Sequence, residues 1–591
     1  MSLFCGIFAL DAAAEIRPEW RNYLRSNLSR SGGGSITEYI DRRLYLAKLD
    51  LGAFDAPGWA SDQSGVTALC GDSLLAKREP SMSRGADVER LHALRAPPSD
   101  LAPALRGSRG SFCAAVYRAL EGELVLATDK VGVRPIYWMS DGRCLVFAGA
   151  LRLIENLPNL PLTVDLRGAM EQACFGFPLA DRTQYFQIHS MRGGELLVCN
   201  STGDGSVRLD PYWRWDRDAC AVVEDDVAPA LHRLHETFAR AVQLRLGGRK
   251  VAFASLSGGL DSRCVVTQLR SAGIDVHSIN VSWRGSADQV LGAMYAKAIG
   301  TTHHEVALPT EETGHTVPSL AWQAMTEFAR KMTDAGGNPR QLWGGDGGSV
   351  GVGHVYMKPA TVQTLRDQGI QAGARGFLQD NSFALTSRPF RAQFVPLARR
   401  LPLESVSAEL ERLDCADSGR ALYVFLLEND QRRHVAPYFE TLDRLPVEFV
   451  EPFYDAEVLS AVCRLPLDYC LRHRMYNEWL RYFAPQIMQV PWQYYPGHEE
   501  CPIPPPPDLP SQWGPSSRAL SARRRDDALG GLSVALGNRS SLKKVLRAEI
   551  LAAAYVAMRL RVTDAFWFGQ QVDALARPFI RCNGRYELSR G

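Results

Sequence analysis

The spacing of apolar residues changes along the chain, and this change indicates its organisation. Up to about residue 205, short apolar runs bounded by turn residues are typical of strands. From about residue 225 the spacing becomes helical, most regularly between 227 and 246. The clearest strand-like runs are 112–117, 123–127 and 145–148. We therefore expect a β-rich domain over residues 1–205 and a domain of a different kind from residue 225.

The second region opens with a strand, a glycine-containing loop, a helix and another strand. Apolar residues 251–254 predict a buried strand, and a helix over 260–271 leads to a second strand at 276–281. Strands that alternate with helices at this spacing favour a parallel α/β sheet, which binds ligands at the carboxyl ends of its strands. We expect this domain to cover residues 225–500.

The rest of the chain gives weaker patterns. Residues 385–485 are predicted to be mostly helical, and the proline run at 502–507 predicts a stiff linker. The final segment, 501–591, combines this linker with a basic helical extension that we interpret as a solvated cap. An apolar stretch at 550–558 is too short to span a membrane and is flanked by charged residues.

Composition excludes few functions, but it indicates which partners and which cell compartment to expect. The 591 residues are 46% hydrophobic and 22% charged, with a net charge of +2, as in an ordinary folded protein. A charge this close to neutral favours neither nucleic acid nor a membrane surface as a partner. The 13 cysteines are scattered singly and contain no C-x-x-C pair, which suits free thiols in a reducing cytoplasm. We expect a cytoplasmic location, no nucleic-acid partner and no membrane insertion.

The loop between the first strand and helix of the second region is the strongest chemical signal. Its sequence, Ser255-Leu256-Ser257-Gly258-Gly259-Leu260-Asp261-Ser262, joins a strand to a helix start, where backbone N–H groups form an anion site. The two glycines permit close approach to a pyrophosphate, and Asp261 can hold Mg²⁺ against the phosphates. We expect Ser255, Ser257, Gly258, Gly259, Leu260, Asp261 and Ser262 to bind ATP. No Gly-Lys-Ser/Thr follows the glycines, so this is not a P-loop; the alternative is a tight turn of small residues.

Four stretches together resemble the glutamine-dependent asparagine synthetase family, over roughly residues 3–500. They are Phe4-Cys5-Gly6-Ile7-Phe8, the segment 127–138 around Asp129-Lys130-Val131-Gly132-Val133-Arg134-Pro135, the loop at 255–262, and Pro452-Phe453-Tyr454-Asp455. The resemblance implies an α+β N-terminal-nucleophile (Ntn) hydrolase-like β-sandwich glutaminase domain. It also implies an α/β ATP-pyrophosphatase (PP-loop) synthetase domain, whose ligands are ATP and Mg²⁺.

The first domain departs from that family at its reaction centre. Such a glutaminase uses an N-terminal cysteine whose own amino group is the base, whereas Cys5 follows Met1, Ser2, Leu3 and Phe4. The family's Asn-Gly-Glu corresponds to Cys70-Gly71-Asp72, and a thiol is a poorer oxyanion donor than an amide. Asp87 can still match the residue that holds the amino group of glutamine. We expect this domain to be inactive and Cys5 to be a buried strand residue.

The second domain keeps the adenylation loop but alters its surroundings. The family's Gly-x-Gly-x-Asp-Glu loop corresponds to 344–350, where Ser349-Val350 replaces the acidic pair and Asp346 stands three positions earlier. We expect Gly345 to contact the nucleotide, and Asp346 either to support Mg²⁺ with Asp261 or to take a proton from the attacking amine; the alternative is a turn capped by Asp346. Glu448 matches a family glutamate and could be a general base, or simply solvated. No lysine occurs near Tyr495, where the family has one, so Arg481 or another cation could substitute.

These features favour an ATP-dependent ligase whose substrate brings its own amine. Family members with a disabled glutaminase include β-lactam synthetases and lasso peptide macrolactam cyclases, and the sequence favours a lasso-type cyclase. Its substrate would be a peptide or small-molecule carboxylate, and a leader peptidase could be a partner. Two alternatives remain open: an amidotransferase that uses glutamine or free ammonia, and a nucleotide-binding scaffold without turnover.

Overall fold

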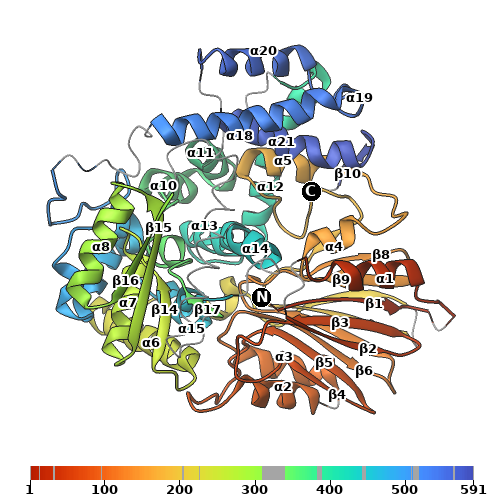
Figure 1. Cartoon of the computed structure of the whole chain (residues 1–591), viewed down its shortest axis with the longest axis horizontal. Helices are drawn as coiled ribbons and strands as arrows, with labels where there is room; N and C mark the ends of the chain where they lie inside the picture. Colours follow the sequence, from red (N-terminus) through yellow and green to blue (C-terminus); the bar gives the residue numbers. More distant parts are fainter. Residues whose placement is uncertain are drawn as a thin grey trace.

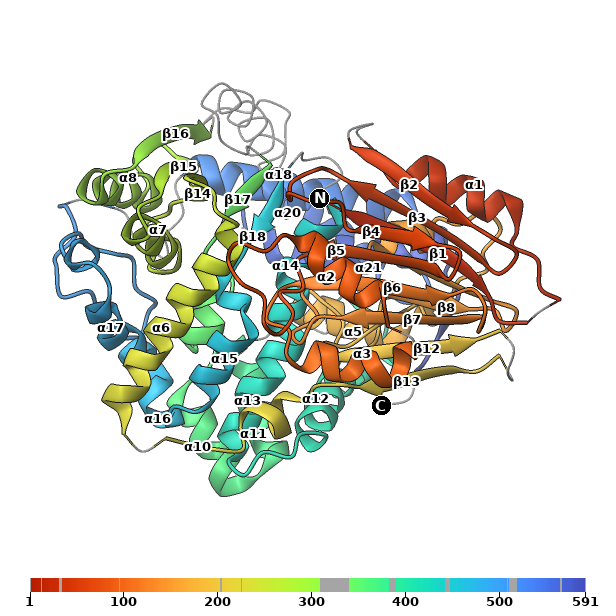
Figure 2. The ribbon, with the colours of Figure 1, turned by 90° about the horizontal axis from the view of Figure 1, so that it is seen from below.

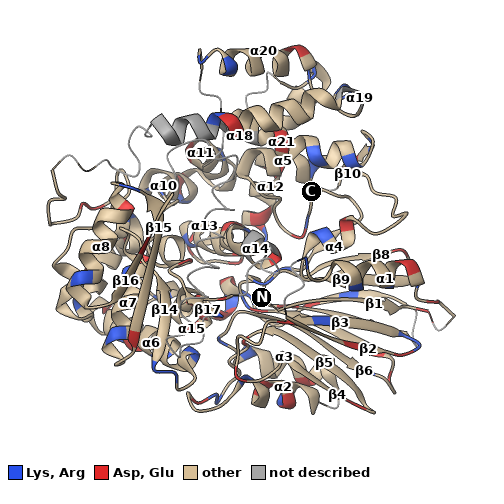
Figure 3. Cartoon of the chain, in the orientation of Figure 1, with Lys and Arg blue, Asp and Glu red and all other residues tan. Residues whose placement is uncertain are grey.

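In the computed structural model the chain has a β-sandwich, a parallel α/β sheet and a helical layer above both (Figure 1). The structure describes residues 2–589, apart from 12, 31–33, 95, 202–204, 225, 309–339, 382–388, 442–446, 508, 510–517 and 564–565. Within these described residues, no helix is both long enough and apolar enough to cross a bilayer. Acidic and basic residues are interspersed along the ribbon of both domains (Figure 3).

The N-terminal domain consists of two six-stranded sheets, whose strands pair antiparallel. The first has the order β11 (His189–Ser190), β8 (Tyr137–Ser140), β9 (Cys144–Ala148), β1 (Leu3–Ala9), β3 (Leu44–Asp50) and β2 (Ser35–Ile40). The second has the order β13 (Val207–Pro211), β12 (Glu195–Asn200), β7 (Glu123–Thr128), β6 (Phe112–Arg118), β5 (Gly65–Gly71) and β4 (Trp59–Asp62). Phe4 and Phe8 of β1 pack between the sheets, and the intervening Cys5 and Ile7 face the opposite side, as strand periodicity requires.

Helices cover the outer faces of both sheets. The first sheet carries α1 (Pro18–Asn27), α4 (Leu151–Glu155) and α5 (Leu166–Phe175), and the second carries α2 (Arg84–His92) and α3 (Pro97–Arg106). Four layers therefore follow one another as helix, sheet, sheet and helix. β13 pairs with β12 and continues the second sheet to Pro211, a few residues beyond the boundary expected at residue 205.

The second domain is built on a five-stranded sheet in which all neighbours pair in parallel. Its order is β16 (Thr302–Leu308), β15 (Asp275–Trp283), β14 (Val251–Ser255), β17 (Gln341–Trp343) and β18 (Glu448–Val450). The helices α6 (Val227–Leu246), α7 (Asp261–Ser271) and α8 (Ala287–Ile299) pack on it through one apolar core. The predicted parallel α/β sheet is thus confirmed, with the glycine loop at the end of its central strand.

A group of helices and short turns completes the second domain. The helices are α10 (Pro359–Gln368), α11 (Ile370–Asn381), α12 (Val395–Glu411), α13 (Ser418–Phe425), α14 (Arg432–Thr441), α15 (Ala456–Cys463), α16 (Leu467–Cys470) and α17 (Arg474–Trp479). The short turns are η1 (Trp215–Ala219), η2 (Gly348–Val352), η3 (Ala392–Phe394), η4 (Leu426–Gln431), η6 (Pro452–Tyr454), η7 (Leu471–His473), η8 (Leu480–Tyr482) and η9 (Pro485–Met488). Except at η3, whose Phe394 lies in the core of the first domain, their side chains join the core of the sheet, so this region is part of the second domain.

The C-terminal extension packs on the N-terminal domain. It forms α18 (Arg518–Gly537), α19 (Arg539–Leu542), α20 (Ala548–Arg559), α21 (Phe566–Arg581) and β19 (Tyr586–Glu587), and β19 pairs in parallel with β10 (Val164–Asp165). Leu532, Leu575 and Phe579 are fully buried in the core that also holds Ala169 of α5. Figure 1 shows these helices lying over α5 and α12. Our interpretation of the extension as a solvated cap is therefore corrected.

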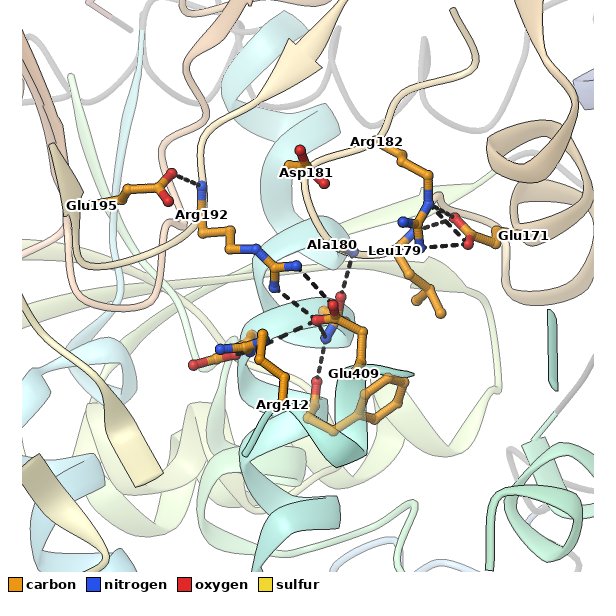
Figure 4. A network of polar contacts seen from close by, with 12 residues as sticks. Glu171, Leu179, Ala180, Asp181, Arg182, Arg192, Glu195, Glu409 and Arg412 are labelled. Atoms are coloured by element: carbon orange, nitrogen blue, oxygen red, sulfur yellow. Dashed lines mark hydrogen bonds and ion pairs between the residues drawn. The ribbon is translucent and has the colours of Figure 1, made fainter. Parts of the chain in front are cut away.

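Buried ion pairs join the two domains. Arg192, before β12, places two guanidinium nitrogens 2.7 Å from the two carboxylate oxygens of Glu409 on α12 (Figure 4). Elsewhere, Arg109 of the first domain and Arg245 of α6 both contact the fully buried carboxylate of Asp455, at 2.9 and 2.7 Å. Removing one partner of such a pair leaves a buried charge unpaired, so these contacts fix how the domains sit.

Candidate functional site

The glycine loop closes on itself through its two inner serines. The N–H of Ser257 donates to the hydroxyl of Ser262 at 3.0 Å, and the two hydroxyl oxygens are 3.1 Å apart. The N–H of Gly259 donates to the Ser257 hydroxyl at 3.2 Å. Ser255, the last residue of β14, donates its hydroxyl to the carbonyl of Trp343 at 3.3 Å and so ties the loop to β17. The strand-to-helix turn is therefore fixed by its own side chains.

A second glycine-rich loop, 344–348, lies directly against the first. A Cβ added to Gly348 would lie 2.5 Å from the carboxyl carbon of Asp261, and one added to Gly345 would lie 2.5 Å from the Ser262 nitrogen. Any side chain at these positions would push the loops apart. The glycines thus bring Asp346 and Asp261 to the same edge of the sheet.

Asp261 is the best-anchored acid of this site. Its carboxylate accepts hydrogen bonds from the Tyr476 hydroxyl at 2.7 Å and from the Ser349 hydroxyl at 2.5 Å. The pKa of Asp261 is raised to about 6. Burial and the charge of Asp346 raise it, and the two hydrogen bonds oppose this increase. Burial also raises the pKa of Asp346. The two acids therefore form a site that a cation would stabilise.

Two cavities flank Asp261. The larger, about 400 Å³, is lined by six predicted residues together with side chains of η4 and α14. The predicted residues are Ser255, Ser257, Asp261, Ser262, Gly345 and Asp346. The smaller, about 170 Å³, is lined by four predicted residues and by the segment after η9. These four are Ser257, Gly259, Leu260 and Asp261. The structure thus brings nearly all predicted nucleotide contacts around one acid.

Gly258 is arranged differently from the expected phosphate cradle. Its N–H donates to the carboxylate of Asp288 at 3.1 Å, and its carbonyl accepts the N–H of Gln493 at 2.9 Å. The Gln493 side chain also donates to Asp288, at 2.6 Å. Gly258 therefore anchors the loop to α8, and the amide that we expected to face phosphate is engaged by this acid.

Neither cavity is lined by lysine or arginine among the residues that the structure describes. Arg481, expected to replace the missing lysine, lies on η8 outside both linings. At the expected lysine position, the Tyr495 hydroxyl donates to Ser349 at 3.3 Å. The basic side chains in the linings are His434 in the larger cavity and His473 in the smaller. A bound polyphosphate would thus depend on backbone amides and a metal ion for its counter-charge.

The acids of the larger cavity fit Mg²⁺. No group of three metal-ligating side chains occurs in the described part of the chain, so Asp261 and Asp346 would be a two-carboxylate site. Mg²⁺ in nucleotide enzymes is usually held by one or two carboxylates together with phosphate oxygens. The raised pKa values of both acids mark an unbalanced negative site that such a cation would neutralise.

The structure places Glu448, the expected general base, away from both cavities. Its side chain is fully buried, where it accepts the N–H of Ser2 at 2.6 Å and pairs with Arg134 at 2.8 Å. Burial opposes ionisation, but the charge of Arg134 and the hydrogen bonds from Arg134 and Ser2 act together against it, and the pKa of Glu448 is lowered. Figure 2 shows the N-terminus beside β18. Glu448 thus holds the two domains together, and the catalytic role predicted for it is corrected.

The acid behind the 344–348 loop is instead Glu451, three residues further on. It accepts the N–H of Asp346 at 3.2 Å, and burial together with the charge of Asp346 raises its pKa well above the ordinary value. Sequence reasoning missed Glu451. Its position directly after β18, at the carboxyl edge of the sheet, was the available signal.

The candidate centre of the first domain is closed. Cys5 lies inside β1, whose two edges pair with β3 and β9, and burial raises the pKa of its thiol. Asp87, expected to hold an amino group, accepts hydrogen bonds from Ser73, Leu75 and Arg78 within its own domain. Cys70 is buried opposite Cys113. The Cys5 thiol has no base beside it among these contacts, and its side chain has no exposed surface.

Comparisons with known proteins follow this division into two domains. Residues 78–213 match the glutamine amidotransferase domain family, and residues 233–335 match the asparagine synthase family. A curated relative, asparagine synthetase [glutamine-hydrolyzing] 3 of Bacillus subtilis (strain 168), is 24% identical over 221 residues. The match covers 34% of this chain and 35% of that protein, so the chain spans about a third of the relative's length. The matches support an asparagine-synthetase-like order of domains.

Two solved structures share a weaker similarity at 12% identity. One is described as the allosteric regulatory enzyme of purine biosynthesis, and the other as the B. subtilis glutamine phosphoribosylpyrophosphate amidotransferase complexed with ADP and GMP. They cover 52% of this chain and 80% and 81% of their own, with TM-scores of 0.26. Scores this low carry no conclusion about fold or function.

Proposed function

We propose that the protein is an ATP-dependent carbon–nitrogen ligase of the asparagine synthetase type, which activates a carboxylate as an acyl-adenylate with release of pyrophosphate. One observation carries the proposal: the glycine loop, Asp261 and Asp346 converge on one cavity at the carboxyl edge of a parallel sheet. The domain matches agree with this assignment.

In this mechanism the chain's residues bind and orient the reactants. The serines of the glycine loop hold the turn rigid, so that its position is set before the nucleotide enters. Asp261 and Asp346 would hold Mg²⁺, which when bound offsets charge on the phosphates. The substrate carboxylate would enter the larger cavity, attack the α-phosphorus of ATP and displace pyrophosphate. An amine then attacks the acyl carbon and AMP leaves.

We propose further that this amine belongs to the substrate, so that the product is a macrolactam or isopeptide bond, as in lasso peptide cyclisation. The buried Cys5 supports this view, because a thiol with no exposed surface and a raised pKa is poorly suited to release ammonia from glutamine. Exposing Cys5 as an N-terminus would remove Leu3 and Phe4 from the packed strand β1. Holding both ends of one substrate in a pocket contributes about 7–11 kcal/mol. A leader-removing protease is the partner class this reaction would require.

The test uses the full chain, Mg-ATP and synthetic linear peptides that each carry a free N-terminal amine and one Asp or Glu. We expect AMP and a product lighter by one water with a subset of peptides. Asp261→Asn should lower AMP formation by at least about 10²-fold, as expected for loss of a charge-stabilising group. The matched control is Asp275→Asn, which changes an exposed acid outside both cavities and should leave the rate unaltered.

Two results would contradict the finer proposal. Formation of asparagine from aspartate with glutamine or ammonium, and no peptide product, would identify an amidotransferase. ATP binding without AMP formation from any carboxylate would identify a scaffold. The comparisons are compatible with the first of these, since the curated relative is named for glutamine hydrolysis.

A further inference from the structure

One side chain on the wall of the larger cavity has no role in the mechanism so far. His434 is exposed at the start of α14, between neighbours that are buried: Arg433 before it and Val435 after it. It lines the larger cavity together with Asp346 and Gln431. An imidazole that turns out of a buried helix into a reaction cavity is free to accept a proton.

Acidic groups surround this imidazole from two elements. The charge of His434 opposes the pKa increase that burial causes in Asp346, on the glycine-rich loop, and in Asp430, on η4. Neither acid forms an ion pair with His434 among the described residues, so the histidine faces the cavity without a fixed partner. Asp261, Tyr356 and Tyr495 are the other titratable groups among the described residues that line this cavity, and burial raises the pKa of all three. Two nearby carboxylates would stabilise an imidazolium once it forms.

We propose that His434 is the general base of the amide-forming step, accepting the proton of the attacking amine. This inference rests on the proposed ligase function. His434 takes the role first expected of Glu448. The two carboxylate oxygens of Glu448 are occupied by Ser2 and Arg134, and Glu448 lines neither cavity. His434 reaches the cavity that Glu448 does not.

The amide-forming step transfers the acyl group from AMP to the amine. The amine nitrogen forms a bond to the acyl carbon of the acyl-adenylate, and the bond from that carbon to the phosphate oxygen breaks, its electron pair leaving with AMP. The ammonium form of the amine loses two protons in all: the second goes to water once the carbon–nitrogen bond has formed, and the first, whose removal frees the lone pair, goes to an imidazole nitrogen of His434. Water takes this proton after AMP departs. A peptide α-amine has a pKa of about 7.7–8.0, so it needs such a base near neutral pH.

The test separates the two half-reactions of the full-length enzyme. With Mg-ATP and a peptide that supports AMP formation, His434→Asn should slow amide formation about 10²-fold or more, the usual contribution of a general base. ATP–pyrophosphate exchange, which reports adenylation alone, should fall far less. Hydroxylamine is already unprotonated at neutral pH, so as acceptor it should restore the variant to near the wild-type rate of hydroxamate formation.

A matched control is His232→Asn, which changes an exposed histidine of α6 outside both cavities and should alter neither half-reaction. The inference is overturned if His434→Asn slows exchange as much as amide formation, if amide formation is unaffected, or if hydroxylamine gives no rescue. If the wild-type enzyme forms no AMP with any carboxylate, the ligase proposal fails and this inference fails with it.

Discussion

Single residues decide which of the two domains can carry out chemistry. In the second domain, Ser349 stands where the related loop has an acid, and its hydroxyl bonds the carboxylate of Asp261. In the first domain, Cys5 is enclosed by the strands on either side of β1. Ser349 therefore holds the acid of one site in place, whereas the flanking strands enclose the cysteine of the other.

Asp261 should make the ligand-free protein sensitive to pH. Burial raises the pKa of this carboxyl from 3.8 to about 6, so folding favours its protonated form. Its contribution to stability is present at low pH and is lost as pH rises through about 6. Asp261→Asn should therefore stabilise the metal-free protein at pH 7.5, by about 1–3 kcal/mol, and much less at pH 5. Thermal unfolding in a chelator measures this, and an equal effect at both pH values would contradict the assigned environment.

Between elements, buried ion pairs fix the interface that sets the position of the site. Arg134 follows β7 and pairs with Glu448, the first residue of β18, while Asp455, after η6, takes two arginines. These contacts connect the sandwich with β18, the edge strand of the parallel sheet, and with the start of α15. The first domain therefore has a structural role, since it supports the edge of the sheet that carries the candidate site.

Removing Arg134 tests this support. Arg134→Met would leave the fully buried Glu448 carboxylate unpaired and should cost about 3–5 kcal/mol of unfolding free energy. The double variant with Glu448→Gln should regain much of this loss. An exposed pair gives the control: Arg25→Met, which removes the partner of Glu38, should cost about 0–1 kcal/mol. Urea unfolding measures all three, and equal costs for Arg134 and Arg25 would show that the interface pair does not hold the domains.

Sequence reasoning recovered the elements but not every side-chain role. Helix 227–246 and the strands of the sandwich follow from local periodicity, which the structure reproduces. Glu448 was misplaced because a motif offset does not say which end of a strand faces the ligand. His434, which lines the cavity, and Tyr476, which donates to Asp261, were missed because both lie on helices far along the chain, which no local pattern encodes.

At the scale of the whole molecule, three parts form one body around the site. The C-terminal helices share a core with α5 of the first domain. Arg192, elsewhere in the first domain, pairs with Glu409 on α12 of the second. The first domain lies beside the α/β sheet, and the extension lies over α5 and α12 (Figure 1). Under the proposed function, the glutaminase-like domain would act as a scaffold and the amine would arrive with the substrate.

A measurement of glutamate release shows whether the first domain hydrolyses glutamine. The intact protein, with its N-terminus verified by mass, is incubated with glutamine and Mg-ATP beside the variant Cys5→Ala. We predict equal background glutamate from both proteins, because the Cys5 thiol is buried and its pKa is raised. Glutamate release by the wild-type protein that Cys5→Ala abolishes would contradict the account and restore an ammonia-transferring synthetase.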